Sequence, residues 1–576
     1  MTDSERAASW KKSARLGLEI GLSLLILLAA AWVPRVQGLH QYVTTDEHLW
    51  LTRSAQFYYA LLHGGYASTY QKEHPGVTTM WAGAAGFARI SPAYRDRPVK
   101  QLNRYQFETY LTQVSDTSFL DILVAGRTFM AMASTLALAL GFLYARRLIG
   151  TLPALVGFLL VALDPFHLAL TRLLHLDGLL SSLMLLAMLS FLCYWKDRRI
   201  GDLILSGVVS GLAWLTKSPG LVLIPTMLLL ALWESWRQPA PAAASRSARR
   251  RMWDLAWPLA VWGAVGSAVF VAAWPAMWVQ PYQTLRSVLE MAQRYAQEGH
   301  DSAVFFNGEI IESGEMRLGY LHFYPLTYLW RSTPVTLLGL LLAIWGWARK
   351  ASPFDQASAR LAGRGLVLIV LTFSLLMTVG TKKFDRYLIP IYPPLDVLAG
   401  MGWVAFAQWL ARSLSRRGAT AGMRSAVIVL SLFLVVAGQA ALAYTTFPYY
   451  LSYYNPLMGG PRAAPRVMQI GWGEGLDQAG RYLKEKENPR KLNVISWYAL
   501  GSVSYYFPGE VRYFRKNPVL DGHELDKLNE SDYAIIYVNQ WQRNLATPAL
   551  EYLSQFSPEH TVWINGIEYA RIYKLP

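Results

Sequence analysis

Charge and cysteine are both scarce in this sequence. Only 16% of the 576 residues are charged, against roughly 25% in a typical soluble domain, while 53% are hydrophobic and 13% are aromatic. This composition excludes a disordered chain, a collagen and a coiled coil, and it disfavours a soluble enzyme. The single cysteine, Cys193, excludes an intrachain disulfide and a cysteine metal cluster. The class that remains is a membrane protein with many helical spans.

Motifs that hold nucleotides are also missing. The sequence contains neither the Gly-x-x-x-x-Gly-Lys-Ser/Thr phosphate loop nor Gly-x-Gly-x-x-Gly, and it has no His-Glu-x-x-His and no Asp-x-Asp. We therefore expect no nucleotide cofactor and no nucleotide carrier for a sugar or phosphate. The net charge of +16 lies in short segments between apolar runs, which indicates attraction to anionic membrane lipids rather than a nucleic-acid partner.

The segments between the apolar runs alternate between rich and poor in Lys and Arg. Because basic residues favour the cytoplasmic side, this alternation predicts a cytoplasmic N-terminus and an extracytoplasmic C-terminus. The first run is expected to remain as a span rather than to be cleaved as a signal peptide, because many spans follow it. The eleven predicted spans lie at 16–33, 120–144, 151–163, 178–195, 202–216, 219–236, 253–274, 333–348, 365–380, 388–410 and 424–444.

Three parts of the chain are predicted to lie outside the cytoplasm. The first outer loop, 34–118, contains amphipathic stretches at 47–62 and 76–90, a pattern typical of helices in the membrane interface. A second outer loop covers 275–332. The third part is the tail after the last span. The predicted division is a transmembrane domain at 1–444 and a C-terminal domain at 445–576.

The tail is long enough to fold as a small α/β domain. A helical pattern at 476–487 is followed by strand-like runs at 493–499, 533–539 and 561–574. The dipeptide Asn565-Gly566 inside the last run predicts a β-hairpin.

The strongest signal for chemistry is Thr45-Asp46-Glu47-His48, directly after the first span. Repulsion between the adjacent carboxylates, with partial burial, is expected to raise the pKa of at least one and to suit it to general-base work. The alternative is a solvated helix start, with Asp46 as the N-cap and Glu47 as a partner of the helix dipole.

Two further motifs carry groups that bind metals or anions. Glu73 and His74, in the same outer loop, could hold a divalent cation or a phosphate, or they could belong to a turn before Pro-Gly. Arg172, His175 and Asp177 precede the fourth span, where charged residues are costly and usually functional. The alternative is an Arg172–Asp177 pair that closes a short loop.

Basic residues at the start of the tenth span break the positive-inside trend. Lys382, Lys383 and Arg386 lie at the predicted outer surface, where a lipid phosphate is their natural partner. The alternative is that these long side chains only reach toward the membrane interface. Lys217, at a tight turn between two spans, fits either interpretation.

These motifs occur in one order: an Asp-Glu pair, a Glu-His-Pro turn, an Arg…Leu-Asp segment, a Thr-Lys turn and an Arg-Tyr-Leu-Ile-Pro span start. Together they resemble the GT-C membrane glycosyltransferases over roughly residues 16–410. In particular they resemble glycosyltransferase family 39, which includes protein O-mannosyltransferases and the aminoarabinose transferases of lipid A. The inserted MIR-type domain of the eukaryotic mannosyltransferases is not found, so the likeness is to a prokaryotic member in the plasma (inner) membrane.

The resemblance implies roles for individual residues. Asp46 matches the catalytic acidic position of the family, and Glu47 matches its usual neighbour. Glu73 and His74 match the acidic and basic positions before the first-loop proline, although the Pro-Gly that follows departs from the family's two prolines and Leu-Gly. Arg386 matches a basic residue near the lipid phosphate.

The implied fold is a multispanning GT-C helical bundle with interfacial helices and a small extracytoplasmic α/β domain. The implied activity is inverting transfer of a sugar from a polyprenyl-phosphate donor to a hydroxyl or amine of a protein, lipid or glycan. Asp46 would act as general base, with Glu47 beside it, and a divalent metal is a candidate cofactor. Candidates to hold the leaving phosphate are Arg386, Lys382, Lys383, Arg172 and Lys217, and further site candidates are His48, His175 and Asp177.

A second interpretation from a different class is a transporter or flippase for a lipid-linked sugar or a small polar solute. It predicts charges at the membrane midplane and an inverted repeat. The sequence shows no internal repeat, and its polar motifs lie in loops on one side, so a one-sided active site is favoured.

Overall fold

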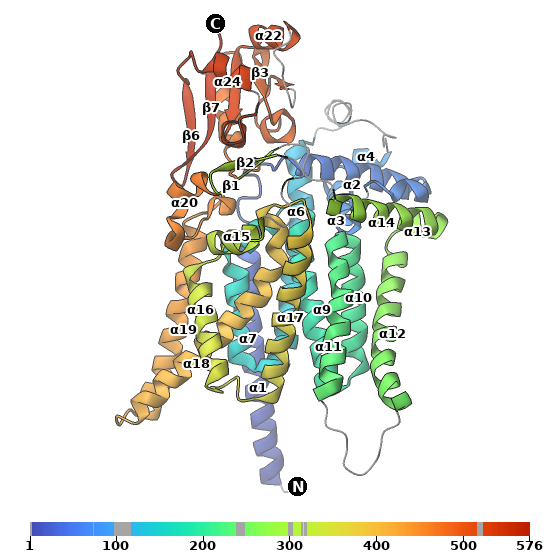
Figure 1. The fold of residues 1–576 in the computed structure, drawn as a ribbon, viewed down its shortest axis with the longest axis vertical. Helices are drawn as coiled ribbons and strands as arrows, with labels where there is room; N and C mark the ends of the chain where they lie inside the picture. Colours follow the sequence, from blue (N-terminus) through green and yellow to red (C-terminus); the bar gives the residue numbers. More distant parts are fainter. Residues whose placement is uncertain are drawn as a thin grey trace.

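Long helices form a bundle, and a small sheet domain lies at one end of it, which we call the outer end (Figure 1). The computed structural model describes residues 3–72, 74–96, 107, 117–237, 248–297, 303–312, 315, 320–514, 522–545 and 547–576. The N- and C-termini lie at opposite ends of the molecule. The bundle consists of α1 (Asp3–Val36), α6 (Phe119–Ile149), α7 (Thr151–Leu163), α9 (Leu176–Asp197), α10 (Ile200–Thr216), α11 (Leu223–Arg237), α12 (Ala248–Ala272), α16 (Pro334–Ala348), α17 (Ala357–Val379), α18 (Tyr392–Ser415) and α19 (Ala421–Tyr444).

Within the described chain, eight helical segments are long and apolar enough to cross a membrane. A ninth is counted if α15 (Phe323–Arg331) and α16, which meet at a bend of 113°, form one span. Both α7 and α10 are shorter apolar helices. The predicted multispanning helical class is confirmed, and each of the eleven predicted runs lies largely on helix. The number of crossings and the side that faces the cytoplasm stay predictions.

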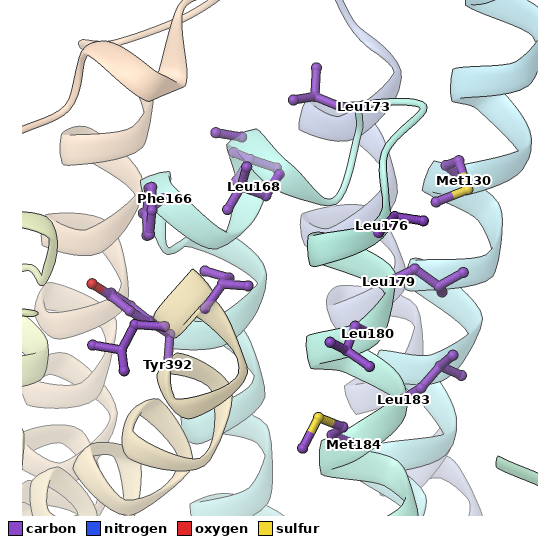
Figure 2. Close-up of a cluster of buried hydrophobic side chains, with 14 of the residues drawn as sticks. Met130, Phe166, Leu168, Leu173, Leu176, Leu179, Leu180, Leu183, Met184 and Tyr392 are labelled. Atoms are coloured by element: carbon purple, nitrogen blue, oxygen red, sulfur yellow. The ribbon is translucent and has the colours of Figure 1, made fainter. Parts of the chain in front are cut away.

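The centre of the bundle is α9, whose apolar window is completely buried. A helix that is hydrophobic on all sides belongs in the interior, because every face of it must be covered. Figure 2 shows Leu179 and Leu183 pointing toward α6, while Leu180 and Met184 point to the opposite side. This packing fixes the outer end of α9, where the polar residues of the candidate site begin.

Short helices lie across the outer end of the bundle (Figure 1). The predicted amphipathic stretches form α2 (Glu47–Leu62) and α3 (Val77–Ile90), which confirms these two helices. A β-hairpin in the second outer loop was not predicted; it pairs β1 (Val304–Phe306) with β2 (Glu309–Ile311). The remaining short helices of this region are α4 (Pro92–Asp96), α8 (Pro165–Leu170), α13 (Ala276–Val279) and α14 (Pro281–Gln297).

The C-terminal part contains a mixed sheet in the order β4-β3-β5-β7-β6. The predicted hairpin is present, with Asn565 and Gly566 both at left-handed φ (52° and 80°), as a tight two-residue turn requires. The short edge strand β4 was not predicted, and the division at residue 444 stays a prediction. The elements are α20 (Gly460–Ala463), α21 (Leu476–Lys484), β3 (Asn493–Ser496), β4 (Glu510–Tyr513), α22 (Gly522–Asn529), β5 (Tyr533–Tyr537), α23 (Val538–Gln542), α24 (Thr547–Leu553), β6 (His560–Ile564) and β7 (Ile567–Lys574).

The sheet domain is bound to the segment that follows α1. Ser502 donates a hydrogen bond to the carbonyl of Val43 at 2.9 Å, and the hydroxyl of Tyr506 donates to the carbonyl of His40 at 2.9 Å. The amide of Thr45 donates to the carbonyl of Trp472 at 3.2 Å. These bonds hold the domain against the residues that lead directly into Asp46.

Candidate active site

Asp46 lies immediately before α2 with its side chain 34% exposed, and it makes no helix-capping hydrogen bond. Its Oδ2 lies 3.6 Å from His175 Nε2 and 3.5 Å from Arg386 Nη2. Burial alone would raise the pKa of Asp46, but the interaction with His175 and the charge of Arg386 outweigh it and hold that pKa below its usual range. The predicted raised pKa is therefore wrong for Asp46, because the residue faces cations rather than only its carboxylate neighbour.

Asp177, at the start of α9, is 2% exposed and lies between three basic side chains. Its Oδ1 is 2.6 Å from Lys217 Nζ. Its Oδ2 is 3.4 Å from His175 Nδ1 and 3.7 Å from Arg386 Nε. His175 and Arg386 thus each lie between Asp46 and Asp177. Acidic and basic groups therefore alternate in a row of charges that runs from Asp46, through His175 and Arg386, to Asp177 and Lys217. Asp177 pairs with Lys217, not with Arg172 as the alternative proposed.

Aromatic rings surround the two cations of this row. Arg386 Cζ lies 4.2 Å from the ring centroid of Trp472 and 4.5 Å from that of Phe384. Lys217 Nζ lies 4.4 Å from the ring centroid of Tyr387. Contacts of this kind fix a cation in place without neutralising its charge.

A groove of about 1190 Å³, counting its open side, starts at Asp177 and Lys217. His74 and Lys382 also line its polar end. Its remaining walls are mostly apolar side chains of α9, α11, α17 and the turn between α10 and α11. These are Leu180, Leu221, Val222, Pro225, Phe373, Leu376 and Met377.

The two predicted turns, 72–76 and 216–218, lie together at this polar end. The amide of Gly76 donates to the carbonyl of Thr216 at 3.2 Å, and His74 Nδ1 lies 3.4 Å from the hydroxyl oxygen of Ser218. Burial, with the charges of Lys217 and Lys382, lowers the pKa of His74 to about 3. His74 is therefore neutral near pH 7 and can offer a hydrogen bond but no charge.

The described residues of this end do not fit a divalent cation. The groups that act on His74 most strongly, after burial, are the cations Lys217 and Lys382. No group of three or more His, Cys, Asp or Glu side chains in the described part of the chain is arranged to hold a metal. Glu73, the other predicted ligand, lies outside the described residues.

A second cavity is lined by Arg386, by residues at the outer end of the bundle and by residues between 468 and 474, just before α21. Its wall includes Arg386 and Asp385 next to the site, Phe305 and Phe306 of β1, and Trp472 of the tail. We call it the outer cavity. It brings together segments that lie far apart in the sequence.

Glu47 does not reach the row of charges. It is completely buried, and Arg127 donates to both of its oxygens, with Arg127 Nε at 2.7 Å from Oε1. The amides of Thr44 and Leu174 donate to it at 3.0 and 2.9 Å. Burial would raise the pKa of Glu47, but Arg127 and the amides lower it, so its predicted raised pKa is wrong. The structure makes Glu47 a fixed support for the loop that carries Asp46.

Three other predicted site residues are also directed elsewhere. Lys383 is buried and donates to the carbonyls of Thr378 and Gly380. Arg172 donates to the carbonyl of Gln37, and its Cζ lies 5.2 Å from the ring centroid of Tyr450. Neither cation lines the groove or the outer cavity. The third, His48, is buried beneath Gly501 of the sheet domain, where a Cβ on that glycine would lie 2.8 Å from the Cβ of His48.

Sequence reasoning missed two residues that shape the site. Arg127 is an arginine inside an apolar run, and a charge at such depth signals a buried partner. Trp472 lies in the sequence Gly471-Trp-Gly-Glu-Gly, where the alternating glycines indicate backbone conformations that other residues rarely adopt. Gly473 has φ +124°, and a Cβ there would lie 2.3 Å from the carbonyl oxygen of Val43.

Solved structures provide distant likenesses. ArnT from Cupriavidus metallidurans bound to undecaprenyl phosphate is 13% identical, with a TM-score of 0.45 over 97% of this chain and 98% of that chain. The Archaeoglobus fulgidus oligosaccharyltransferase AglB, in complex with an inhibitory peptide and a dolichol-phosphate, is 11% identical, with a TM-score of 0.44 over 98% and 74%. A protein O-mannosyltransferase complex from S. cerevisiae bound to its sugar donor is 18% identical, with a TM-score of 0.36 over 46% and 34%. Likenesses this distant establish nothing about activity.

No curated protein sequence matches the chain. Residues 110–246 match the family described as dolichyl-phosphate-mannose-protein mannosyltransferase. This segment contains His175, Asp177 and Lys217, whereas Asp46 and Arg386 lie outside it. The match confirms the predicted resemblance for one part of the chain: residues 110–246 carry the signature of this mannosyltransferase family.

Proposed function

We propose that this protein transfers a sugar from a polyprenyl-phosphate donor to a hydroxyl or amine of an acceptor, at the extracytoplasmic face of a prokaryotic plasma membrane. One observation carries the proposal: the groove joins a cationic end, with Lys217 and Lys382, to walls of apolar helix side chains. A lipid phosphate has the same division into a charged head and an apolar tail. The family match, which names a lipid-phosphate sugar donor, supports this choice of substrate.

The donor phosphate would lie at the polar end of the groove. Lys217 and Lys382 face the phosphate oxygens there, and Arg386 lies next along the row. As the bond between the anomeric carbon and the phosphate oxygen breaks, charge grows on the departing polyprenyl phosphate. Fixed cations in a partly buried site stabilise that charge without reorganising.

Asp46 stands at the opposite end of the row from Lys217. Its carboxylate takes the proton of the acceptor hydroxyl while the acceptor oxygen bonds to the anomeric carbon. The electron pair of the broken bond leaves with the phosphate. Because the base and the leaving group lie at opposite ends, attack in a single displacement inverts the anomeric carbon.

His175 and Asp177 act as positioning residues in this mechanism. His175 lies between the two carboxylates, and Asp177 holds Lys217 at 2.6 Å and lies 3.7 Å from Arg386. The positions of both cations, Lys217 and Arg386, therefore depend on one buried carboxylate. No step is assigned to a metal, because Lys217 and Lys382 act on His74 more strongly than Asp177 does, and Asp177 is paired with Lys217.

The proposal is tested with full-length protein in detergent and a panel of radiolabelled polyprenyl-phosphate monosaccharides. The measurement is release of the sugar from the lipid phosphate, which slow hydrolysis by water provides even without an acceptor. We expect one sugar to be released, and we expect Asp46→Asn to slow release about 100- to 1000-fold. Asp121→Asn is the matched control, since Asp121 is an exposed carboxylate at the outer end of α6.

Near-normal release by Asp46→Asn would remove Asp46 as the base. Absence of release and of binding for every donor would overturn the transferase proposal. Donors that move between the leaflets of a vesicle without release would support the transporter interpretation instead.

A further inference from the structure

The outer cavity has no role in the donor site, although it meets the same arginine. Arg386 lines it, and Arg386 Nη2 lies 3.5 Å from Asp46. The groove begins at Asp177, which lies 3.7 Å from Arg386 Nε, and Arg386 itself does not line the groove. A molecule in the outer cavity would therefore meet Arg386, the neighbour of Asp46, without occupying the groove.

The lining of the outer cavity is rich in aromatic rings. Five phenylalanines and one tryptophan contribute, together with polar side chains of Gln469, Asp385 and Glu474. Aromatic faces bind flat apolar surfaces, while carboxylate and amide groups bind hydroxyls. The aromatic residues are Phe166, Phe305, Phe306, Phe323, Phe384 and Trp472.

The outer cavity is lined by equal numbers of positively and negatively charged side chains. Its two cations are Arg331 and Arg386, and its two carboxylates are Asp385 and Glu474. Arg331 Nη2 lies 2.6 Å from Asp385, and Arg386 faces Asp46 and Asp177. A phosphorylated acceptor would need more cations than carboxylates around it, as at the polar end of the groove. The outer cavity does not supply such an excess. The lining therefore favours an uncharged molecule.

We propose that the outer cavity binds the acceptor and that the acceptor is a neutral sugar unit of a glycan. A sugar ring offers apolar C–H faces to the aromatic rings and hydroxyls to Gln469, Asp385 and Glu474. The proposal rests on the proposed function, because one ring hydroxyl must reach Asp46. That hydroxyl oxygen forms the new glycosidic bond, its proton passes to Asp46, and polyprenyl phosphate leaves with the electron pair.

This assignment gives the segments outside the bundle a role in binding the acceptor. The β1 strand supplies Phe305 and Phe306, and the tail supplies Gln469, Trp472 and Glu474. The amide of Phe305 donates to Gln469 Oε1 at 3.3 Å, which joins the two segments directly. The acceptor site is therefore built from the second outer loop and the C-terminal part together.

The experiment uses full-length protein in detergent with three classes of probe. These are neutral disaccharides (maltose, cellobiose and N,N′-diacetylchitobiose), a Ser/Thr-containing peptide, and a phosphorylated glycolipid. Binding of each disaccharide is measured by saturation-transfer NMR without donor. Transfer of the radiolabelled sugar to each probe is measured with donor, and donor hydrolysis is recorded in parallel.

Phe305→Ala and Gln469→Ala are the test variants. The matched control is Ile310→Ala, because Ile310 pairs with Phe305 across the hairpin but is 44% exposed and does not line the cavity. We expect at least one disaccharide to bind and to accept the sugar. The ratio of transfer to donor hydrolysis should fall about tenfold in each test variant, as loss of one ring contact or hydroxyl partner predicts, and stay at the wild-type level in Ile310→Ala.

Three results would overturn the proposal. The first is that no disaccharide binds. The second is that binding and the transfer ratio are the same in Phe305→Ala and Ile310→Ala. The third is transfer only to the peptide or only to the phosphorylated glycolipid. If no donor is hydrolysed at all, the proposed function fails, but the NMR measurement still decides whether the cavity binds sugar.

Discussion

The indole of Trp472 packs against Arg386 on one side and His175 on another. Arg386 Cζ lies 4.2 Å from its ring centroid, and the His175 ring meets it edge-on with centroids 4.8 Å apart. Glu474 Oε2 accepts a hydrogen bond from the Trp472 amide at 2.6 Å, and Gly473 permits contact with the Val43 carbonyl. A residue of the C-terminal part is thus fixed against both neighbours of Asp46.

This contact predicts that Trp472 is a positioning residue for Arg386. Trp472→Ala should lower kcat for donor hydrolysis about tenfold while leaving the donor KM within about twofold, since a partly desolvated cation–π contact is worth roughly 1–2 kcal/mol. Trp472→Phe should recover most of the rate because it restores a ring face. The control is Trp563→Ala, on the exposed face of β6. Equal rates for the Ala and Phe variants would contradict the role.

Much of the architecture could be predicted because apolar periodicity is local. The helical runs, the amphipathic helices α2 and α3 and the Asn565-Gly566 turn each depend on neighbouring residues in the sequence. The polar motifs were also correctly grouped in part: Asp46, Asp177, Lys217 and Arg386 do meet at the outer end.

Other features depend on side-chain direction, which sequence alone does not give. Glu47 follows Asp46 directly, yet the start of α2 turns it inward to Arg127. Lys382 and Lys383 are also neighbours, and only Lys382 lines the groove. The part played by Trp472 depends on how the tail folds back onto the loop before α2, a contact between segments far apart in the chain.

The buried pair of Glu47 and Arg127 predicts a loss of stability rather than of one catalytic group. Their side chains are 0% and 2% exposed, so Glu47→Gln leaves a buried arginine without its counter-charge. The free energy of unfolding should fall by about 3–5 kcal/mol. Thermal unfolding in detergent measures this.

The double variant Glu47→Gln with Arg127→Met provides the control for that pair. It removes both charges, so it should be less destabilised than Glu47→Gln alone. Wild-type stability of Glu47→Gln, combined with loss of donor hydrolysis, would instead return Glu47 to a catalytic role.

The pH dependence of donor hydrolysis follows from the lowered pKa of Asp46. A carboxyl whose pKa is lowered stays ionised as the pH falls, and it loses its base form only below the ordinary range near about 4. Asp46 should therefore cause no loss of rate between pH 8 and pH 5. In Arg386→Gln, one source of the lowering is gone, so the acid limb of the residual rate should move to higher pH. A wild-type acid limb centred above pH 5 that Arg386→Gln does not move would contradict this assignment.

Donor hydrolysis should not require a divalent cation. At the polar end of the groove, Lys217 and Lys382 lie around a neutral His74, and the carboxylate of Asp177 is already paired with Lys217. The two lysines repel a metal ion rather than bind it. We expect the rate in EDTA, after removal of bound metal, to stay within about twofold of the untreated rate. Loss of activity in EDTA that Mg²⁺ or Mn²⁺ restores would place a metal at Glu73 and His74.

The groove predicts a preference for long-chain donors that one substitution should remove. Leu376 of α17 lines the groove and is 47% exposed, so a tryptophan there can fill the groove without disturbing the core. Leu376→Trp should raise KM about tenfold for a donor with a full polyprenyl chain, because each methylene kept out of the groove forfeits about 0.8 kcal/mol. A donor with only two isoprene units should be affected much less, since its phosphate still reaches Lys217. Leu371→Trp, on the same helix but outside the groove, is the matched control. An equal change for both chain lengths, or the same change in Leu371→Trp, would show that the lipid tail lies elsewhere on the bundle.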